Sequence, residues 1–232
     1  MNRQFGLSLR LSTVKDTVKS CKTAADIGCD HGYVSIALIE DNKADKVIAC
    51  DINEGPLSAA SENINAAGFE GRIFTRLSDG LEKITAEDNV DCIIIAGMGG
   101  RLMKDILERG KDIAKNASQL VLSPQSEMFL IRAWLRDNGF MTESEKMIED
   151  GGKFYWIMSA VKGREEEYPP KVRRLYDEYS GYLIKASDDT LKKYLRYQLE
   201  MNEKYLQKAT GDSRERLLHT INDIESALGM ME

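Results

Sequence analysis

The sequence is poor in the residues that most often build metal centres and disulfide frameworks. Its 232 residues include four cysteines and two histidines, namely Cys21, Cys29, Cys50, Cys92, His31 and His219. No two of the cysteines form a CxxC pair, which structural zinc sites commonly use. The composition therefore argues against a metal site, and the cysteines are expected to pack as small apolar side chains.

Long apolar runs are missing as well. No segment approaches the roughly 18 apolar residues that a membrane-spanning helix needs. Residues 1–11 place Arg3 and Arg10 among polar residues and lack the apolar stretch of a signal peptide. We therefore expect a cytoplasmic protein. The formal net charge of −6 argues weakly against nucleic-acid binding, although a local basic patch can bind phosphates on an acidic protein.

Between residues 24 and 161, short apolar segments alternate with amphipathic ones, which is typical of a parallel α/β sheet. We predict strands over residues 24–27, 46–51, 72–77, 90–96 and 119–123, and helices over 32–40, 56–67, 101–109 and 127–138. Strands over 140–149 and 153–161 follow, joined at Gly151-Gly152 as an antiparallel hairpin. A mostly parallel sheet that ends in a hairpin is the layout of Rossmann-like class I methyltransferases.

The composition changes after residue 162. Residues 163–170 are polar, end in two prolines and are typical of a linker. Beyond them, apolar residues recur at steps of three and four, as in helices packed in a coiled coil. We predict three helices there, two of them long and antiparallel. The chain then divides into a Rossmann-like catalytic domain, residues 1–162, and a small α-helical coiled-coil domain, residues 163–232. A helix over residues 8–18 is expected to cover one edge of the sheet.

A glycine-rich loop joins the first strand to the next helix, with the sequence Asp26-Ile-Gly28-Cys-Asp30-His-Gly32. Gly28 permits a sharp turn and lets a ligand approach the backbone. Gly32 opens the helix, whose N-terminal amides favour a negatively charged group. Either Asp26 or Asp30 suits an amino group on the same ligand. Two roles of the His31 side chain fit the sequence equally well: contact with a ligand, or a hydrogen bond to the loop backbone.

Acidic residues and a second glycine cluster follow the next three strands. Asp51 ends the second strand about 20 residues after the glycine loop, the spacing at which an acid meets ribose hydroxyls. Asp79 follows the third strand and can accept a hydrogen bond from an adenine amino group. Ala96-Gly97-Met98-Gly99-Gly100 follows the fourth strand. All these segments lie at the carboxyl ends of strands, where open α/β sheets bind ligands.

This set favours S-adenosyl-L-methionine over NAD as the cofactor. The NAD fingerprint needs GxGxxG, and Asp26 occupies the position of its first glycine. We predict a cofactor site formed by Asp26, Gly28, Cys29, Asp30, His31, Gly32, Asp51, Ile52, Asp79, Gly80, Ala96, Gly97 and Met98.

The sequence resembles the bacterial tRNA (adenine-22-N1)-methyltransferase family, TrmK. The matching segments are Leu7-Ser-Leu-Arg-Leu11, Ala25-Asp-Ile-Gly-Cys-Asp-His-Gly32, Ile95-Ala-Gly-Met-Gly-Gly100, Leu122-Ser-Pro-Gln125 and Asp150-Gly-Gly-Lys-Phe-Tyr-Trp156. The sequence departs from the family pattern at Ser123, where Gln is expected, and at Gly151-Gly152, where a single Gly is more usual. Both departures lie in loops on the substrate side.

The resemblance implies methyl transfer from S-adenosyl-L-methionine to N1 of adenine 22 in the D arm of tRNA. Adenine N1 is itself a nucleophile, so the enzyme mainly has to position and desolvate a base that has left its stack. We expect catalysis to involve Gly97, Met98, Gly99 and Asp26, with residues 97–100 as the floor of the adenine pocket. We expect the tRNA to contact Arg10, Gly99, Gly100, Arg101, Pro124, Gln125, Lys153, Lys192, Lys193 and Arg196.

Two other functions fit less of the sequence. One is a Rossmann-like methyltransferase for another RNA, a protein or a small molecule. The second is a non-enzymatic module that binds partners through its helical tail. The intact glycine loop and the acids Asp51 and Asp79 argue against this second function. Because the apolar stripes of the tail can be buried within one chain, we expect a monomer.

Overall fold

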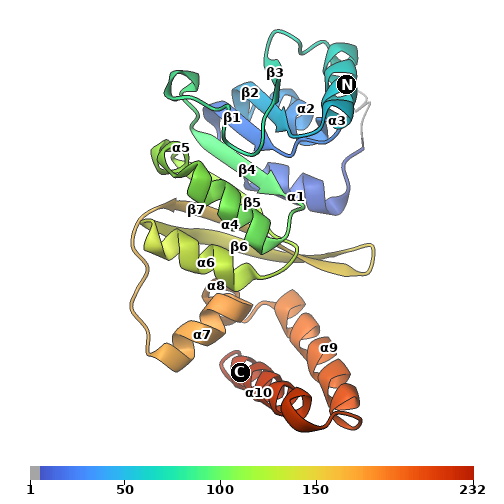
Figure 1. Ribbon diagram of the computed structural model, residues 1–232, viewed down its shortest axis with the longest axis vertical. Coiled ribbons are helices and arrows are strands. Elements are labelled where there is room, and N and C mark those ends of the chain that lie inside the picture. Colours follow the sequence, from blue (N-terminus) through green and yellow to red (C-terminus); the bar gives the residue numbers. More distant parts are fainter. Residues whose placement is uncertain (1–5) are drawn as a thin grey trace.

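A seven-stranded sheet forms the centre of the computed structural model, which describes residues 6–232. The strands are β1 Cys21–Ile27, β2 Ala44–Asp51, β3 Ile73–Leu77, β4 Cys92–Ala96, β5 Gln119–Ser123, β6 Phe140–Asp150 and β7 Lys153–Lys162. Their order in the sheet is β3-β2-β1-β4-β5-β7-β6. β7 is antiparallel to both of its neighbours, and the other pairs are parallel. The predicted parallel sheet with a final antiparallel hairpin is confirmed (Figure 1).

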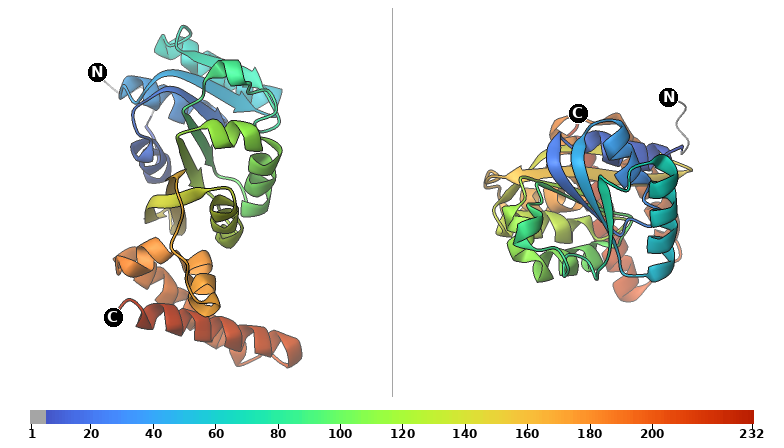
Figure 2. Two further views of the ribbon diagram at one scale, coloured as in Figure 1. Left: turned by 90° about the vertical axis from the view of Figure 1, so that its left-hand side faces the viewer. Right: turned by 90° about the horizontal axis from the view of Figure 1, so that it is seen from above.

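Helices cover both faces of the sheet, as the view from above in Figure 2 shows. One face carries α1 Leu9–Thr17, α2 Tyr33–Glu40 and α3 Glu54–Ala67, and the other carries α4 Gly100–Arg109, α5 Lys111–Asn116 and α6 Met128–Asp137. A 3-10 turn, η1, spans Ala86–Asp88. The first four residues of the central strand β4 are buried because alternate side chains enter the two opposite cores: Cys92 and Ile94 one, Ile93 and Ile95 the other.

Two sequence predictions about helices in this domain were incomplete. α1 lies against α2 and against the face formed by β5, β7 and β6, rather than along an edge of the sheet. The buried Val14 of α1 and Val18, which caps the helix, belong to the same core as the α2 side chains, and this packing fixes the position of α1. The short helix α5 was not predicted, because six residues are too few to display a helical period.

The tail contains four helices instead of the predicted three: α7 Pro170–Tyr179, α8 Gly181–Lys185, α9 Asp189–Leu206 and α10 Gly211–Gly229. The break falls at Ser180, whose φ is 74° and whose buried hydroxyl accepts a hydrogen bond from the Leu183 backbone N–H, capping α8. α9 and α10 form the predicted long pair and lie beyond the β6–β7 hairpin (Figure 1).

The apolar core runs without interruption from the sheet into the tail. Trp156 of β7 packs edge-on against Tyr194 of α9, with ring centroids 4.9 Å apart, and Phe154 contacts the same ring at 5.3 Å. Leu191 and Leu195 of α9 are fully buried in the same cluster as the sheet residues. The linker after β7 therefore marks a change in the path of the chain but not a gap in the core.

The order of the strands reverses between β1 and β4, which are neighbours in the sheet but not in the sequence. At such a point the loops that leave the carboxyl ends of the two strands diverge and leave a crevice between them. The loops predicted to bind the cofactor leave β1 and β4 at this crevice. In residues 6–232, no helix is both long and apolar enough to cross a lipid bilayer.

Candidate active site

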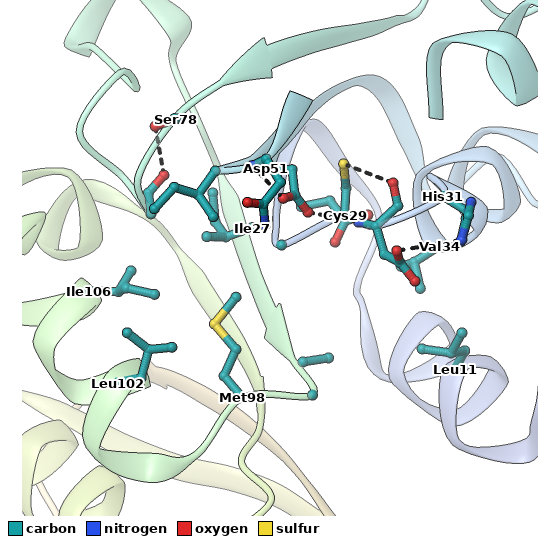
Figure 3. A pocket seen from close by; sticks show the side chains of 18 of the residues that line it. Leu11, Ile27, Cys29, His31, Val34, Asp51, Ser78, Met98, Leu102 and Ile106 are labelled. Carbon is teal, nitrogen blue, oxygen red and sulfur yellow. Dashed lines mark hydrogen bonds and ion pairs between the residues drawn. The ribbon is translucent and has the colours of Figure 1, made fainter. Parts of the chain in front are cut away.

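A pocket of about 430 Å³ opens at the carboxyl ends of β1, β2, β3 and β4 (Figure 3). That volume lies in the range of small-molecule sites. The pocket brings together most of the residues singled out from the sequence: Arg10, Asp26, Gly28, Cys29, Asp30, His31, Asp51, Ile52, Asp79, Gly80, Ala96, Gly97, Met98 and Gln125.

Backbone hydrogen bonds fix the loop after β1 at the edge of the pocket. The N–H groups of Gly28 and Cys29 both donate to the carbonyl of Cys50, at 2.8 and 2.9 Å. Gly28 has φ 74°, and a Cβ at this position would stand 2.4 Å from the Met98 Cε atom. The absence of a side chain therefore lets the β4 loop close over the β1 loop.

Asp26 lies at the base of the pocket and is 5% exposed. Ser35 of α2 donates a hydrogen bond of 2.7 Å from its hydroxyl to the Asp26 carboxylate. Burial raises the pKa of this carboxyl to about 6, although the hydrogen bond from Ser35 opposes the rise. The side chain of Asp30 is 70% exposed. Of the two acids that the sequence left open, Asp26 is the one buried in the pocket.

Asp51 orients the loop that lies above it. Its carboxylate accepts hydrogen bonds from the backbone N–H of Asp30 at 3.2 Å and of Asn53 at 2.9 Å. These two bonds fix the side chain, which lines the pocket and has further lone pairs that can accept hydrogen bonds. A carboxylate held in this way can accept from hydroxyl groups of a ligand.

Asp79 also lines the pocket, but a neighbour that the sequence analysis missed restrains it. Both oxygens of its carboxylate accept from Arg109 of α4, at 2.8 and 2.9 Å. The Arg109 guanidinium lowers the pKa of Asp79, so this carboxylate stays ionised. Arg109 could not be found from spacing, because the two residues lie 30 positions apart.

The glycine cluster after β4 is fastened to the loop after β5. The Gly97 N–H donates to the Ser123 carbonyl at 3.1 Å, the Gln125 N–H to the Met98 carbonyl at 2.9 Å, and the Gly100 N–H to the Ser126 carbonyl at 2.9 Å. Two loops that are more than 20 residues apart in sequence thus form one rigid wall of the pocket.

Gly100 is the residue in this wall that tolerates a side chain least. A Cβ at Gly100 would stand 2.5 Å from the backbone carbonyls of Ser126 and Glu127, whereas one at Gly99 would meet only the mobile Ser126 hydroxyl at 3.2 Å. We expect Gly100→Ala to lower the free energy of unfolding by about 1–3 kcal/mol, because the backbone must move apart. Gly99→Ala is the matched control, and equal thermal unfolding of the two variants would contradict this account.

Arg10 brings a cation to the same wall. Its guanidinium lies over the Tyr155 ring at 5.5 Å, and its backbone N–H donates to Asp150 at 3.0 Å, so the β6–β7 hairpin holds it. The Nη1 atom would be 3.3 Å from a Cβ on Gly97. This atom is buried and has no hydrogen-bond partner among the described residues. A buried unpaired guanidinium N–H calls for an acceptor on a ligand.

The remaining predicted site residues do not line the pocket: Gly32, Gly99, Gly100, Arg101, Pro124, Lys153, Lys192, Lys193 and Arg196. Gly32 serves packing, since a Cβ there would stand 3.2 Å from that of Ala60. Arg101 pairs with Glu127 on the surface. Lys193 of α9 forms an ion pair with Glu149 of β6, so this lysine joins the tail to the hairpin.

Eight further residues, most of them apolar, complete the lining, and the sequence analysis did not single them out: Leu11, Ile27, Tyr33, Val34, Asn53, Ser78, Leu102 and Ile106. Leu102 and Ile106 lie one turn apart on α4, so their spacing carried a signal. His31 is about half exposed and stacks on Tyr33, with centroids 5.7 Å apart. The pocket therefore joins apolar walls to several carboxylates and to one cation, Arg10, whose Nη1 atom is buried. It suits a zwitterionic ligand that also carries hydroxyl groups.

Comparison with known proteins gives this pocket a context. A family model described as a methyltransferase domain matches residues 7–158. The tRNA (adenine(22)-N(1))-methyltransferase of Bacillus subtilis (strain 168) is 37% identical over 160 residues, which are 69% of this chain and 67% of that protein.

Solved structures match the whole fold, tail included. The Streptococcus pneumoniae protein Sp1610 in complex with S-adenosyl-L-methionine has a TM-score of 0.86 and 32% identity, covering 96% of this chain and 100% of that one. M. capricolum TrmK in complex with S-adenosyl-homocysteine has a TM-score of 0.87 and 26% identity, covering 97% and 99%.

Proposed function

Since this chain belongs to the tRNA (adenine-22-N1)-methyltransferase family, we propose that it transfers the methyl group of S-adenosyl-L-methionine to N1 of adenine 22 in the D arm of tRNA. The observation that carries the proposal is the convergence of Asp26, Asp51, Asp79 and Arg10 on one pocket at the reversal of strand order.

These residues fit the groups of the cofactor. Asp26 would accept from its ammonium, Asp51 from the ribose hydroxyls and Asp79 from the adenine amino group. The unpaired Nη1 of Arg10 would donate to the carboxylate of its methionine part. When bound, S-adenosyl-L-methionine supplies an electrophilic methyl group on a sulfonium.

No side chain has to act as a nucleophile, because the lone pair of adenine N1 attacks the methyl group. Cys29 lines the pocket, but burial raises the pKa of its thiol far above neutrality, so it offers no thiolate. We propose that Gly97, Met98 and Gly99 act by shape, giving the base a close approach to the methyl group. The rigid wall that links the loops after β4 and β5 supports this role.

We propose that the tRNA reaches this pocket as a flipped-out base and contacts exposed cations on its way. Candidates beside the pocket wall and on the hairpin are Arg101 and Lys153. Lys192, Lys193 and Arg196 lie on α9, and of these Lys193 is partly engaged by Glu149. The tail would then extend the tRNA-binding surface of the protein beyond the pocket.

We also propose that residues 1–162 form the catalytic domain, that residues 163–232 form the helical domain, and that the chain acts as a monomer in the cytoplasm. The burial of Leu191, Leu195, Ile224 and Ala227 within one chain supports the monomer, because it leaves the main apolar stripes of the tail covered.

The test is to incubate the protein with labelled S-adenosyl-L-methionine and tRNA lacking the modification, digest the RNA and identify the nucleoside. We expect N1-methyladenosine at position 22. Cofactor binding without incorporation into tRNA would instead favour another RNA, a protein or a small molecule as the substrate.

Arg10→Met tests the placement of the cofactor carboxylate. We expect the dissociation constant for S-adenosyl-L-methionine to rise about 10-fold or more, because a charge-assisted hydrogen bond is lost. Isothermal titration calorimetry measures it. An unchanged cofactor affinity with a raised KM for tRNA would show that Arg10 binds a phosphate instead.

A further inference from the structure

Gln125 is the first residue of the β5 loop that reaches the mouth of the pocket. Its backbone N–H is fixed to the Met98 carbonyl at 2.9 Å, directly beside the Gly97 bond to Ser123. The position of this residue is therefore set by the same ladder that holds the glycine cluster.

The side-chain carboxamide of Gln125 is not engaged by other described residues. It is exposed, and its Nε2 atom would lie 3.8 Å from a Cβ on Gly97. No described residue forms a hydrogen bond with it. A base that enters against Gly97 would thus meet one free group that can both donate and accept.

We propose that Gln125 is the residue that selects adenine, by binding the N6/N7 edge of the target base. Its Oε1 accepts from the N6 amino group and its Nε2 donates to N7. This is the bidentate pairing that glutamine makes with adenine, and it leaves N1 free to face the methyl group. Guanine offers two acceptors on that edge, so only half of the pairing can form. Arg10, the neighbouring cation, cannot replace Gln125 because a guanidinium has no acceptor.

The two hydrogen bonds contribute at different stages. As N1 forms its bond to the methyl carbon and the sulfur–carbon bond breaks, positive charge spreads over N1 and N6. The N6–H then donates more strongly to Oε1, so this bond favours the transition state and acts on kcat. The bond to N7 gains nothing from that charge and contributes to binding of the base, hence to KM.

The inference rests on the proposed function, and atomic substitution in the tRNA separates the two. The tRNA carries adenosine, 7-deazaadenosine or purine riboside at position 22, and thus lacks N7 or the N6 amino group in turn. Wild type, Gln125→Ala, Gln125→Glu and the neighbouring control Ser126→Ala are compared by kcat/KM on each tRNA. Thermal unfolding of each variant checks that it is folded.

We expect loss of N7 to reduce kcat/KM about 10-fold in wild type and Ser126→Ala, and to have no effect in either Gln125 variant, since neither keeps the donor. We expect removal of the N6 amino group to be about 10-fold less harmful in Gln125→Ala than in wild type or Gln125→Glu, which both keep the acceptor. Equal penalties in all four proteins would overturn the inference. Absence of methylation of the adenosine tRNA by wild type would overturn the proposed function itself.

Discussion

Glu145→Gln is expected to lower the free energy of unfolding by about 3–5 kcal/mol, since it breaks a buried ion pair from one side. Glu145 of β6 and Arg132 of α6 are both almost fully buried and form an ion pair. Ser180 donates its hydroxyl to the same carboxylate, and Arg132 also donates to the carbonyl of Asp177 at 2.6 Å. The substitution keeps the size of the side chain but leaves the Arg132 charge uncompensated.

This network connects α6 and β6 with the end of α7. We therefore expect the loss of stability to affect both the sheet and the helical tail. Urea unfolding followed by tryptophan fluorescence measures it, since Trp134 and Trp156 lie in the shared core. Glu200→Gln is the control, as its pair with Lys204 is exposed on both sides and is screened by solvent, so its loss should change the stability little. Similar losses in the two variants would contradict the account of the network.

Asp26→Asn is expected to act in opposite directions on cofactor binding and on stability. The dissociation constant for S-adenosyl-L-methionine should rise about 100-fold near pH 8, because the buried carboxylate that we propose as the partner of the cofactor's ammonium is lost. Titration calorimetry with the cofactor measures this change. Asp30→Asn, at a side chain that is 70% exposed, should change the constant far less.

The cofactor-free Asp26→Asn protein should meanwhile be more stable than wild type. A carboxyl whose pKa rises from 3.8 to about 6 on folding disfavours the folded state, by about 3 kcal/mol once the pH is above 6. This penalty is absent below pH 3.8 and grows as the pH rises towards 6. The stability difference between the variant and wild type should therefore shrink on acidification from pH 8 to pH 4. A difference that does not change with pH would refute the assigned cause.

The same group predicts how cofactor binding depends on pH. Below about pH 6 the Asp26 carboxyl takes up a proton and no longer offers a charge to the ammonium. Affinity in wild type should fall about 10-fold between pH 8 and pH 5, whereas Asp26→Asn should show no such fall.

Local sequence was sufficient for the elements and for the acids at the strand ends. The strand predicted over residues 119–123 coincides with β5, because an apolar run bounded by a serine and a proline carries its own limits. Asp26, Asp51 and Asp79 could be placed together from order alone, since the carboxyl ends of parallel strands share one edge of a sheet.

Contacts between distant segments could not be predicted in this way. No sequence pattern around Asp79 indicates that Arg109 is its ion-pair partner, and none around Lys193 indicates Glu149. The steps of three and four predicted three helices after the linker, but the hydroxyl of Ser180 donates to Glu145 and the chain turns there from α7 into α8, which gives a fourth helix. A hydrogen bond to a buried carboxylate can end a helix that the apolar pattern would continue. Leaving the buried carboxylate without this bond costs more free energy than interrupting the helix.

The sequence by itself therefore determined the sheet, the order of its strands along the chain and the acids and glycines at the strand ends that meet at the pocket, because periodicity and strand-end chemistry are local properties. Only the tertiary structure decided that Asp26 is buried, that the buried Nη1 of Arg10 lacks a hydrogen-bond acceptor among the described residues, and how the tail joins the core. Burial, charge pairing and the close approach of Gly100 to the next loop depend on segments that the chain brings together only when it folds.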